Sequence, residues 1–448
     1  MRKNHKRAAV AATVAAAVML AAGCGTSADE GQAGGSGQAA EGSQSADGAE
    51  ASGEQVTITY YYDASYADST KKVVEDFEKA NPNIKIQLVD LPAESNKKLQ
   101  TVSTIMQAQD PSLDVFEMDC TWPLTFISAG WVEPVDDIYT DEEKAAFFQG
   151  PIEANTYDGT LYSAPLYMDA GVLLYRKDML DKYGYEPPKT WDELAEISKD
   201  IMSKEETITS GYSSGWKQYE ALTCSALEFI WGYGGDVIDE EGNLVINSPE
   251  TIQGLQRMHD LTYVDKITDP GINGYKWSES RAPFYSGNVL FIRDWPTAMA
   301  GANDPETSSI AGNVALAPIP GGTDGDNNYN TLGGWSVGIS AFSEHKEEAK
   351  TFVKYLTSVE AQKTRAIYKG LMPVSPEVYD DADVLEAQPQ FAQLKEIGEK
   401  SKSRPKTPYY SELSSVLQQG FASILADSQT PEEAIAEMEP QLEEILSR

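Results

Sequence analysis

The sequence predicts an α/β fold in which helices cover both faces of a parallel sheet. Two observations lead to this class. From residue 55 onward, β-branched and aromatic runs alternate with stretches whose apolar residues recur at helical spacing. Parallel strands also need a long crossover, usually a helix, so the repeated order of strand and helix favours a parallel sheet. The chain has 448 residues, which is enough for two or three domains.

The first elements follow from the spacing of apolar residues. Val73, Phe77 and Ala80 share one face of a helix, and Asn81-Pro82 ends it. Short β-branched and aromatic runs on either side are typical of strands. The expected order is a strand at 56–62, a helix at 68–80, a strand at 84–88, a helix around 99–106 and a strand at 114–118.

Later elements are expected where helix-start signals follow apolar runs. Residues 171–175 predict a buried strand, and the carboxylate of Asp178 is expected to cap the helix after it. Thr190 and Thr430 each precede a Glu by three positions, which is the spacing of a capping box. The last helix has an apolar stripe made of Ile435, Met438, Leu442 and Ile445.

The charge balance excludes several classes of function. The sequence has 35 Lys and Arg against 70 Asp and Glu, a formal net charge of −35. Nucleic acids and anionic membrane surfaces need clustered positive charge, so neither is an expected partner. The three His (His5, His259 and His345) lack metal-ligand spacing, so we expect no metal site, no histidine-centred catalysis and no cofactor.

The first 54 residues have the pattern of an export signal and a tether. Basic residues within 1–7 precede the apolar stretch 8–22, which is too short to span a bilayer as a stable helix. Residues 20–24, LAAGC, resemble the lipobox of bacterial lipoproteins, although Ala21 departs from the usual Leu. We therefore expect residues 1–23 to be a lipoprotein signal peptide and Cys24 to carry lipid. An ordinary cleavage site that contains a Cys is the alternative.

The stretch that follows Cys24 is expected to be a disordered, lipid-anchored tether over residues 24–54. It has no aromatic and no branched aliphatic side chain after the Cys, so it cannot bury enough apolar surface to offset the entropy of ordering. The folded body would then work outside the cytoplasm, at the outer face of the cell membrane.

Six motifs, taken in order, resemble one family. They are YRKDMLDKYG at 175–184 with PPKTWDEL at 187–194, KQYE at 217–220, RDWP at 293–296, LGGW at 332–335, RP at 404–405 and PYY at 408–410. Together they resemble the family 1 extracellular solute-binding proteins, the capture subunits of ABC sugar importers, and most closely the trehalose/maltose-binding group. The resemblance runs from about residue 56 to the C-terminus.

The resemblance implies a type II periplasmic-binding-protein fold, with two α/β lobes joined by a hinge and a ligand cleft between them. The implied N-terminal lobe comprises residues 55–166 and 313–372, and the C-terminal lobe comprises residues 167–312 and 373–448. The chain is expected to cross first near 165–170, to return near 313–339 and to leave again near 371–374. A disulfide between Cys120 and Cys224 would lock the lobes, so both are expected to be buried thiols.

The resemblance also implies a site made of acids, aromatic platforms and basic side chains. A sugar offers hydroxyl pairs to carboxylates and to Arg, and an apolar C–H face to aromatic rings. Asp119 follows a predicted strand, and α/β sheets bind ligands beyond the carboxyl ends of their strands. The predicted ligand-binding residues are Tyr66, Lys98, Asp119, Tyr167, Asp169, Tyr275, Trp295, Gly334, Trp335 and Arg404.

Two of these positions differ from the family pattern. Lys98 stands where close relatives carry an Arg, and Tyr66 stands where they carry an acid, which leaves the identity of the disaccharide open. The remaining indoles are not among the predicted ligand-binding residues. Trp131 and Trp191 are expected to pack, whereas Trp216, Trp231 and Trp277 are ambiguous.

The sequence therefore predicts a non-enzymatic, monomeric lipoprotein that captures a neutral di- or oligosaccharide of the trehalose/maltose type and delivers it to an ABC permease. A secreted glycosidase that uses Asp119 and Asp169 as its acid pair is the first alternative. The same fold with a peptide or a metal as cargo is the second. The sequence leaves open the saccharide, its chain length, the affinity and the identity of the permease.

Overall fold

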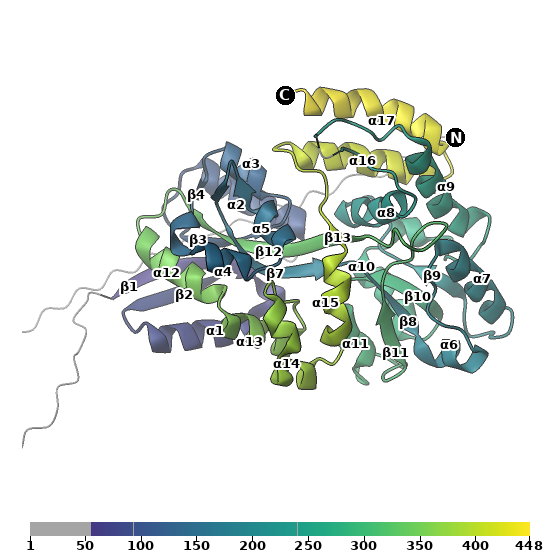
Figure 1. Cartoon of the computed structure of the whole chain (residues 1–448), viewed down its shortest axis with the longest axis horizontal. Coiled ribbons are helices and arrows are strands. Elements are labelled where there is room, and N and C mark those ends of the chain that lie inside the picture. The colour runs from purple at the N-terminus through teal and green to yellow at the C-terminus, as the bar shows by residue number, and fades with distance from the viewer. Residues whose placement is uncertain (1–54, 93, 240) are drawn as a thin grey trace, which may run out of the picture. The chain divides into compact units, whose positions relative to one another are not determined.

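The computed structural model describes residues 55–92, 94–239 and 241–448 (Figure 1). The predicted signal peptide at 1–23, the lipidation site at Cys24 and the tether at 24–54 lie outside the described residues. Among the helices of the described ranges, none combines the length and the apolar character needed to cross a bilayer.

The first sheet has seven strands, and its first three run in parallel as predicted. β1 pairs in parallel with both β2 and β3. The sheet is mixed, however, because β12 runs antiparallel to β3, β4 and β7. The strands are β1 (Val56–Asp63), β2 (Ile84–Leu91), β3 (Val115–Asp119), β4 (Val132–Glu133), β7 (Ala164–Ala170), β12 (Asn330–Ser340) and β13 (Ser401–Lys402), with the path β13-β12-β3-β1-β2.

The second sheet has four strands in the order β11-β8-β10-β9. They are β8 (Val172–Arg176), β9 (Ser210–Ser213), β10 (Val289–Asp294) and β11 (Val314–Ala317). β8 lies antiparallel between β10 and β11, and β9 pairs in parallel with β10. A separate hairpin is formed by β5 (Thr156–Tyr157) and β6 (Thr160–Leu161).

Helices cover both faces of the first sheet, as the apolar spacing predicts. On one face, Phe77 contacts Phe352 with their ring centroids 4.9 Å apart. On the other face, Phe116 contacts Phe126 at 5.7 Å. The helices that flank or follow this sheet are α1 (Ala67–Ala80), α2 (Ser95–Gln107), α3 (Pro123–Ser128), α4 (Asp141–Ala145), α5 (Gln149–Ala154), α12 (Lys346–Leu356), α13 (Val359–Lys369), α14 (Ala382–Ala387) and α15 (Phe391–Glu399), with the 3-10 turns η1 (Ala64–Tyr66), η2 (Asp136–Ile138) and η4 (Pro376–Asp380).

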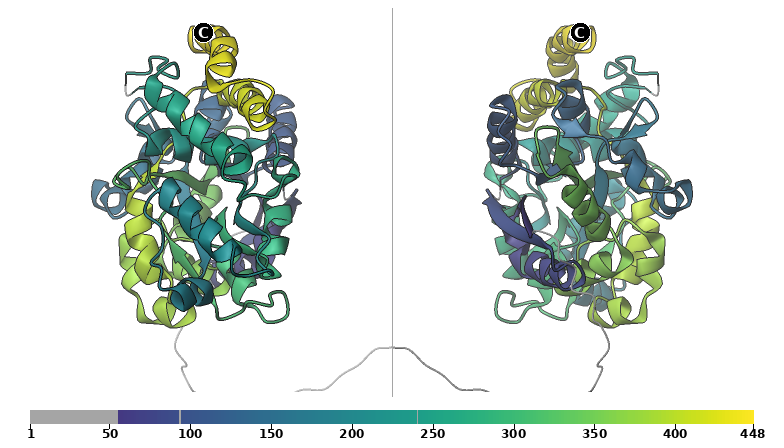
Figure 2. Two further views of the ribbon diagram at one scale, coloured as in Figure 1. Left: turned by 90° about the vertical axis from the view of Figure 1, so that its right-hand side faces the viewer. Right: turned by 90° about the vertical axis from the view of Figure 1, so that its left-hand side faces the viewer.

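The second sheet packs against a different set of helices. Trp191 at the start of α7 stacks on Phe229 of α8 with ring centroids 3.9 Å apart, which confirms its expected packing role. The last two helices, α16 and α17, pack on each other, and α16 also packs on α8. In Figure 2, α16 and α17 are drawn in yellow. This set is α6 (Lys177–Tyr183), α7 (Trp191–Met202), α8 (Glu220–Gly232), α9 (Pro249–Tyr263), α10 (Trp277–Tyr285), α11 (Ala298–Asn303), α16 (Tyr410–Leu425), α17 (Pro431–Leu446) and the 3-10 turn η3 (Ile272–Gly274).

The chain passes between the two sheets at positions that differ in part from the expected ones. The first passage is at Gly171, between β7 and β8. Residues 314–317 belong to β11 of the second sheet, so the return to the first sheet occurs only after them, in 318–329. Residues 376–399 likewise do not leave the first lobe, because α15 packs on β7 of the first sheet, and α14 and η4 pack on α13. The pairing of β13 with β12 places the last passage after Lys402.

The predicted helix starts near Asp178, Thr190 and Thr430 are confirmed. Thr190 accepts a hydrogen bond from the backbone of Glu193 at 3.1 Å, and Thr430 forms a complete capping box with Glu433. The prediction that the Asp178 carboxylate caps its helix was wrong. The helix begins at Lys177, so Asp178 already lies inside its first turn, and its carboxylate accepts from the Arg176 guanidinium instead of from the first amides.

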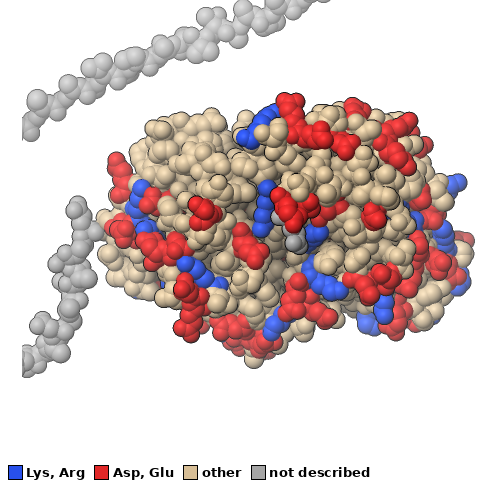
Figure 3. All heavy atoms as spheres, turned by 45° about the horizontal axis from the view of Figure 1, so that its top comes forward, with Lys and Arg blue, Asp and Glu red and all other residues tan. Residues whose placement is uncertain are grey.

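Acidic side chains are spread over the surface. On the face shown in Figure 3, carboxylates lie on both halves of the described body and are interspersed with Lys and Arg. The mixture agrees with an excess of Asp and Glu over Lys and Arg in the sequence. A surface of this kind favours solubility and does not attract polyanions.

Candidate functional site

Asp119 and Trp335 lie opposite each other on paired strands. Asp119 is the last residue of β3, and in the register of the sheet it faces Trp335 of β12. One carboxylate oxygen of Asp119 accepts from the backbone N–H and the hydroxyl of Thr121, at 3.0 and 2.8 Å. These local bonds hold the carboxylate at the end of the strand.

Arg404 joins the two lobes at this point. Its Nη2 lies 3.3 Å from Asp119 Oδ1, and its Nη1 donates to Glu220 Oε1 of α8 at 2.6 Å. The side chain is 4% exposed, and its Nε has no hydrogen-bond partner within the described residues. Tyr410 and Ser414 also donate to the Glu220 carboxylate. Arg404 therefore connects a carboxylate of the first lobe to one of the second.

The indole of Trp335 contacts a buried cation and a second indole. Lys98 Nζ lies 4.0 Å from the ring centroid, and the Lys98 side chain, 1% exposed, forms an ion pair with Asp63. Trp122 meets the indole edge-to-face with a centroid distance of 5.5 Å. Lys98 is thus beside Trp335, as part of a buried ion pair.

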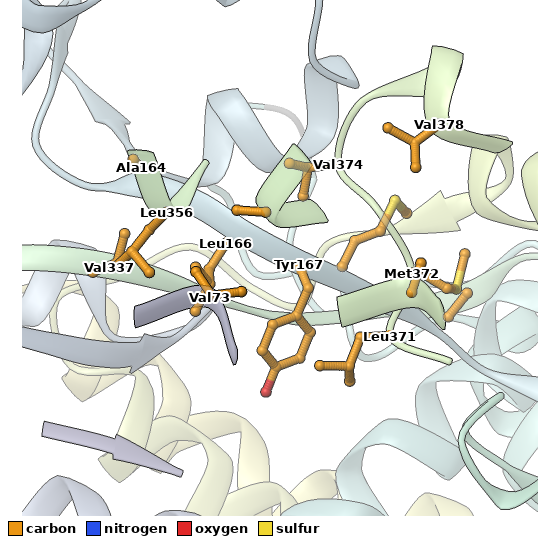
Figure 4. Close-up of a cluster of buried hydrophobic side chains, with 14 of the residues drawn as sticks. Val73, Ala164, Leu166, Tyr167, Val337, Leu356, Leu371, Met372, Val374 and Val378 are labelled. Carbon is orange, nitrogen blue, oxygen red and sulfur yellow. The ribbon is translucent and has the colours of Figure 1, made fainter. Parts of the chain in front are cut away.

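Tyr167 and Tyr66 form a second aromatic group beside β12. Their rings meet edge-to-face at 5.8 Å. Figure 4 shows Tyr167 among buried apolar side chains that include Leu371, and its hydroxyl has no hydrogen-bond partner among the described residues. Gly334 allows this close packing: its φ is +122°, and a Cβ there would lie 2.5 Å from the Tyr167 carbonyl oxygen. The Gly334 backbone therefore fits against β7 only without a side chain.

Asp169 is the most perturbed carboxyl of the site. It lies on β7, opposite Gly333 of β12. Burial raises its pKa to about 7, whereas the Ala170 N–H and the nearby Arg293 guanidinium lower it. Its own backbone contact is a single 3.3 Å hydrogen bond from Ala170. Asp169 therefore has spare acceptor capacity and titrates near neutral pH.

Trp295 and Trp277 enclose an arginine of the second lobe. The Arg293 guanidinium carbon lies 4.3 Å from the Trp295 ring centroid and 4.9 Å from that of Trp277. Glu228 of α8 accepts from Arg293 Nε at 2.8 Å and from its Nη2 at 2.5 Å. A Cβ on Gly333 would lie 2.9 Å from a Trp295 ring carbon, so β12 touches this indole directly.

The structure gathers most of the predicted site residues around one stretch of β12. Residues 333–335 contact or pair with Asp119, Tyr167, Asp169 and Trp295. Small pockets flank the stretch. One is lined by Tyr167, Gly333, Gly334 and Trp335 among others, and a second by Cys120, Leu332 and Arg404 among others. Tyr275 packs instead against the core of the second lobe.

Sequence reasoning missed the acids and the arginine that hold the site together. Asp63, Glu228 and Arg293 all lie in buried ion pairs next to predicted residues. Arg293 belongs to the motif at 293–296 but was not predicted as a site residue, because no local pattern showed that its guanidinium would lie against the Trp295 ring. Of the ambiguous indoles, Trp277 joins the site, whereas Trp216 and Trp231 are buried in the second core.

The lobes also touch at their rims, and both cysteines are free. Lys276 and Glu94, which precede α10 and α2, form an ion pair at 3.2 Å. Cys120 is half-buried and Cys224 is buried, and burial raises the pKa of each thiol to about 12. The thiol form is therefore the stable one at neutral pH. Within the described ranges, no three His, Cys, Asp or Glu side chains gather as metal ligands.

The family of bacterial extracellular solute-binding proteins matches residues 63–363 of the sequence. The chain belongs to this family. A probable ABC transporter-binding protein of Deinococcus radiodurans is 34% identical over 403 residues, which is 88% of this chain and 94% of that protein. The resemblance seen in the sequence motifs, to capture subunits of ABC sugar importers, is thereby confirmed.

A solved structure of this solute-binding class has the same fold. Maltose-bound MalE3 of T. maritima is 36% identical and covers 87% of this chain and 99% of its own, with a TM-score of 0.80. A mannitol-binding protein of Pseudomonas aeruginosa is 25% identical over 305 residues, 67% of this chain and 68% of that protein. The predicted type II periplasmic-binding-protein fold is confirmed, and the extracellular family places the body outside the cytoplasm.

Proposed function

We propose that this solute-binding protein captures a neutral di- or oligosaccharide of the trehalose/maltose type for an ABC permease. One observation carries the proposal. A single short stretch of β12 brings two indoles, Trp335 and Trp295, next to two carboxylates, Asp119 and Asp169. Flat rings suit the apolar face of a pyranose, and carboxylates accept from its hydroxyl pairs.

The other polar groups fit the same ligand. The Tyr167 hydroxyl and Arg404 Nε are buried and have no partner among the described residues, so each has a hydrogen bond to give. Tyr66 lies against Tyr167, which pairs with Trp335 across β7 and β12, and Gly334 pairs with Met168 next to them. The carboxylates of the site outnumber its basic groups, which favours an uncharged ligand over an anionic one.

The similar proteins support first a neutral, hydroxyl-rich ligand in general and then an α-glucoside in particular. The T. maritima structure is described as maltose-bound, and the P. aeruginosa relative as mannitol-binding. A relative from Halalkalibacterium halodurans, 25% identical over 226 residues, is named an arabinooligosaccharide-binding protein. These ligands share many hydroxyls and no charge. The α-glucoside assignment rests on the first of them and on the motifs of the sequence.

The proposal also covers the attachment of the protein to the membrane and the movement of its lobes on ligand binding. A lipid on Cys24 and the tether at 24–54 would keep a monomeric body at the outer membrane face, near its permease. The two lobes, which meet at Gly171, in 318–329 and after Lys402, would rotate about these passages. Contacts of the ligand with both lobes would favour the closed form.

A panel of saccharides tests the proposed ligand. We expect trehalose, maltose or maltotriose to raise the melting temperature, because a ligand that binds only the folded state stabilises it. Calorimetry on any hit then gives the affinity. Sucrose and isomaltose serve as linkage controls, and a tripeptide serves for the peptide alternative. A melting temperature that no saccharide shifts would contradict the proposal.

Sugar affinity is expected to rise with pH through neutrality because of Asp169. Its pKa is raised to about 7 without ligand, and hydroxyl donors favour its charged form. Affinity should therefore fall as the pH drops below 7, with a limiting slope of about tenfold per pH unit, and level off above it. Titration calorimetry at pH 5.5, 6.5, 7.5 and 8.5 measures this, and Asp169→Asn should be weaker and flat across the series. A pH-dependent Asp169→Asn variant would assign the effect elsewhere.

The glycosidase alternative has one observation in its favour. A general acid needs a raised pKa, and Asp169 has one. Its partner Asp119, however, already contacts Arg404 and Thr121. We expect no glucose release from trehalose or maltose over many hours at pH 6. Turnover that is lost in both Asp119→Asn and Asp169→Asn would establish an enzyme.

A further inference from the structure

One face of each candidate platform is covered by a buried cation from the same lobe. Lys98 Nζ lies 4.0 Å from the Trp335 centroid in the first lobe, and the Arg293 guanidinium lies 4.3 Å from the Trp295 centroid in the second. Arg293 is 0% exposed, as buried as Lys98. A cation over an indole face is attracted to the ring, most strongly when both are removed from water.

Carboxylates hold both cations on the rings. Asp63 pairs with Lys98, and its other oxygen accepts from the Ser65 backbone at 2.9 Å. Glu228 takes two bonds from Arg293 and a third, at 3.1 Å, from the backbone N–H of Thr331. If either cation moved away from its ring, it would leave a buried carboxylate without its partner, which is costly.

Neighbouring groups limit the rings further. Trp122 packs on Trp335 and Trp277 packs on Trp295 in T-shaped arrangements, with ring centroids 5.5 and 6.1 Å apart. At Gly171, a Cβ would lie 2.1 Å from a Glu228 oxygen, so the chain passage itself fits tightly against the second ion pair. Each indole therefore has a buried cation over one face and a second indole packed against it at a steep angle, which together restrict its orientation.

We propose that Lys98 and Arg293 are positioning residues, which hold Trp335 and Trp295 for stacking rather than donating to the ligand. This rests on the proposed function, and it changes the role that the sequence suggested for Lys98. A ring fixed before binding loses no rotamer freedom when the ligand arrives, so affinity rises without an added contact.

Double-mutant cycles with maltose, or with whichever panel sugar binds, test the roles. We expect Lys98→Met to weaken binding about tenfold in the wild type and to have no effect in Trp335→Ala. Arg293→Lys should behave in the same way toward Trp295→Ala. A direct donor would cost the same affinity in either background, which would overturn the proposal. Lys98→Arg should restore most of the loss.

Two further variants keep the test independent of folding defects. Asp63→Asn combined with Lys98→Met removes both charges together and should bind as weakly as Lys98→Met while melting at a higher temperature. Lys354→Met is the matched control, because Lys354 also lies over an aromatic ring, that of Tyr139 at 4.7 Å, and pairs with a carboxylate, that of Glu143, and it should leave affinity unchanged.

A measurement without sugar separates this inference from the proposed function. The fluorescence difference between the protein and Trp335→Phe reports on Trp335 alone. Lys98→Met should increase quenching of that component by acrylamide at least twofold, whereas Lys354→Met should not. If no saccharide binds the wild type, the proposed ligand is wrong, and this quenching still decides whether Lys98 positions the ring. Unchanged quenching refutes the positioning role.

Discussion

Trp335→Ala is expected to weaken sugar binding about thirtyfold or more. Buried aromatic anchors are typical hot spots, and truncating one costs about 2 kcal/mol or more. Here the indole is held in place before the ligand arrives, by Lys98 over one face and by the T-shaped contact with Trp122. The lost stacking area is therefore the main consequence for the ligand. Titration calorimetry with the best sugar of the panel measures the change.

Two controls make the Trp335 result specific. Trp335→Phe keeps a flat ring of smaller area and should recover part of the affinity. Tyr157→Ala removes an aromatic ring that is 49% exposed in the β5–β6 hairpin, and it should change nothing. If Trp335→Ala binds like the wild type at equal folded fraction, Trp335 is not in the site.

Arg404→Ala is expected to lower both sugar affinity and stability. It leaves Asp119 and Glu220 without their shared guanidinium, and breaking a buried ion pair from one side costs about 3–5 kcal/mol. We expect a melting temperature lower by several degrees and binding weaker by at least tenfold, because the lobes lose their common partner. Calorimetry and thermal unfolding measure the two effects separately.

The chain offers a matched control for Arg404. Arg448 also pairs with carboxylates, Glu412 and Glu444, but at the surface, where such pairs contribute little. Arg448→Ala should therefore leave both affinity and melting temperature close to wild type. Arg404→Lys keeps the charge but not the fork, so it should fall between wild type and Arg404→Ala. Equal behaviour of Arg404→Ala and Arg448→Ala would contradict the bridging role.

Most residues of the candidate site were predicted from the resemblance to the family, and local signals in the sequence added support for some of them. Asp119 and Trp295 follow apolar runs, and the glycines before Trp335 signal close backbone approach. The partners of these residues were out of reach. Lys98 and Asp63 are 35 positions apart, and no local pattern shows that one will neutralise the other over an indole.

Local sequence decided where strands and helices begin, which three strands run in parallel and to which family the chain belongs. These features depend on neighbouring residues through backbone sterics, side-chain periodicity and end capping. Tertiary structure alone decided the direction of β12, the places where the chain passes between sheets, and which charges lie paired beneath the rings. Those outcomes depend on distances between segments far apart in the chain, where burial makes each unpaired charge costly and so selects its partner.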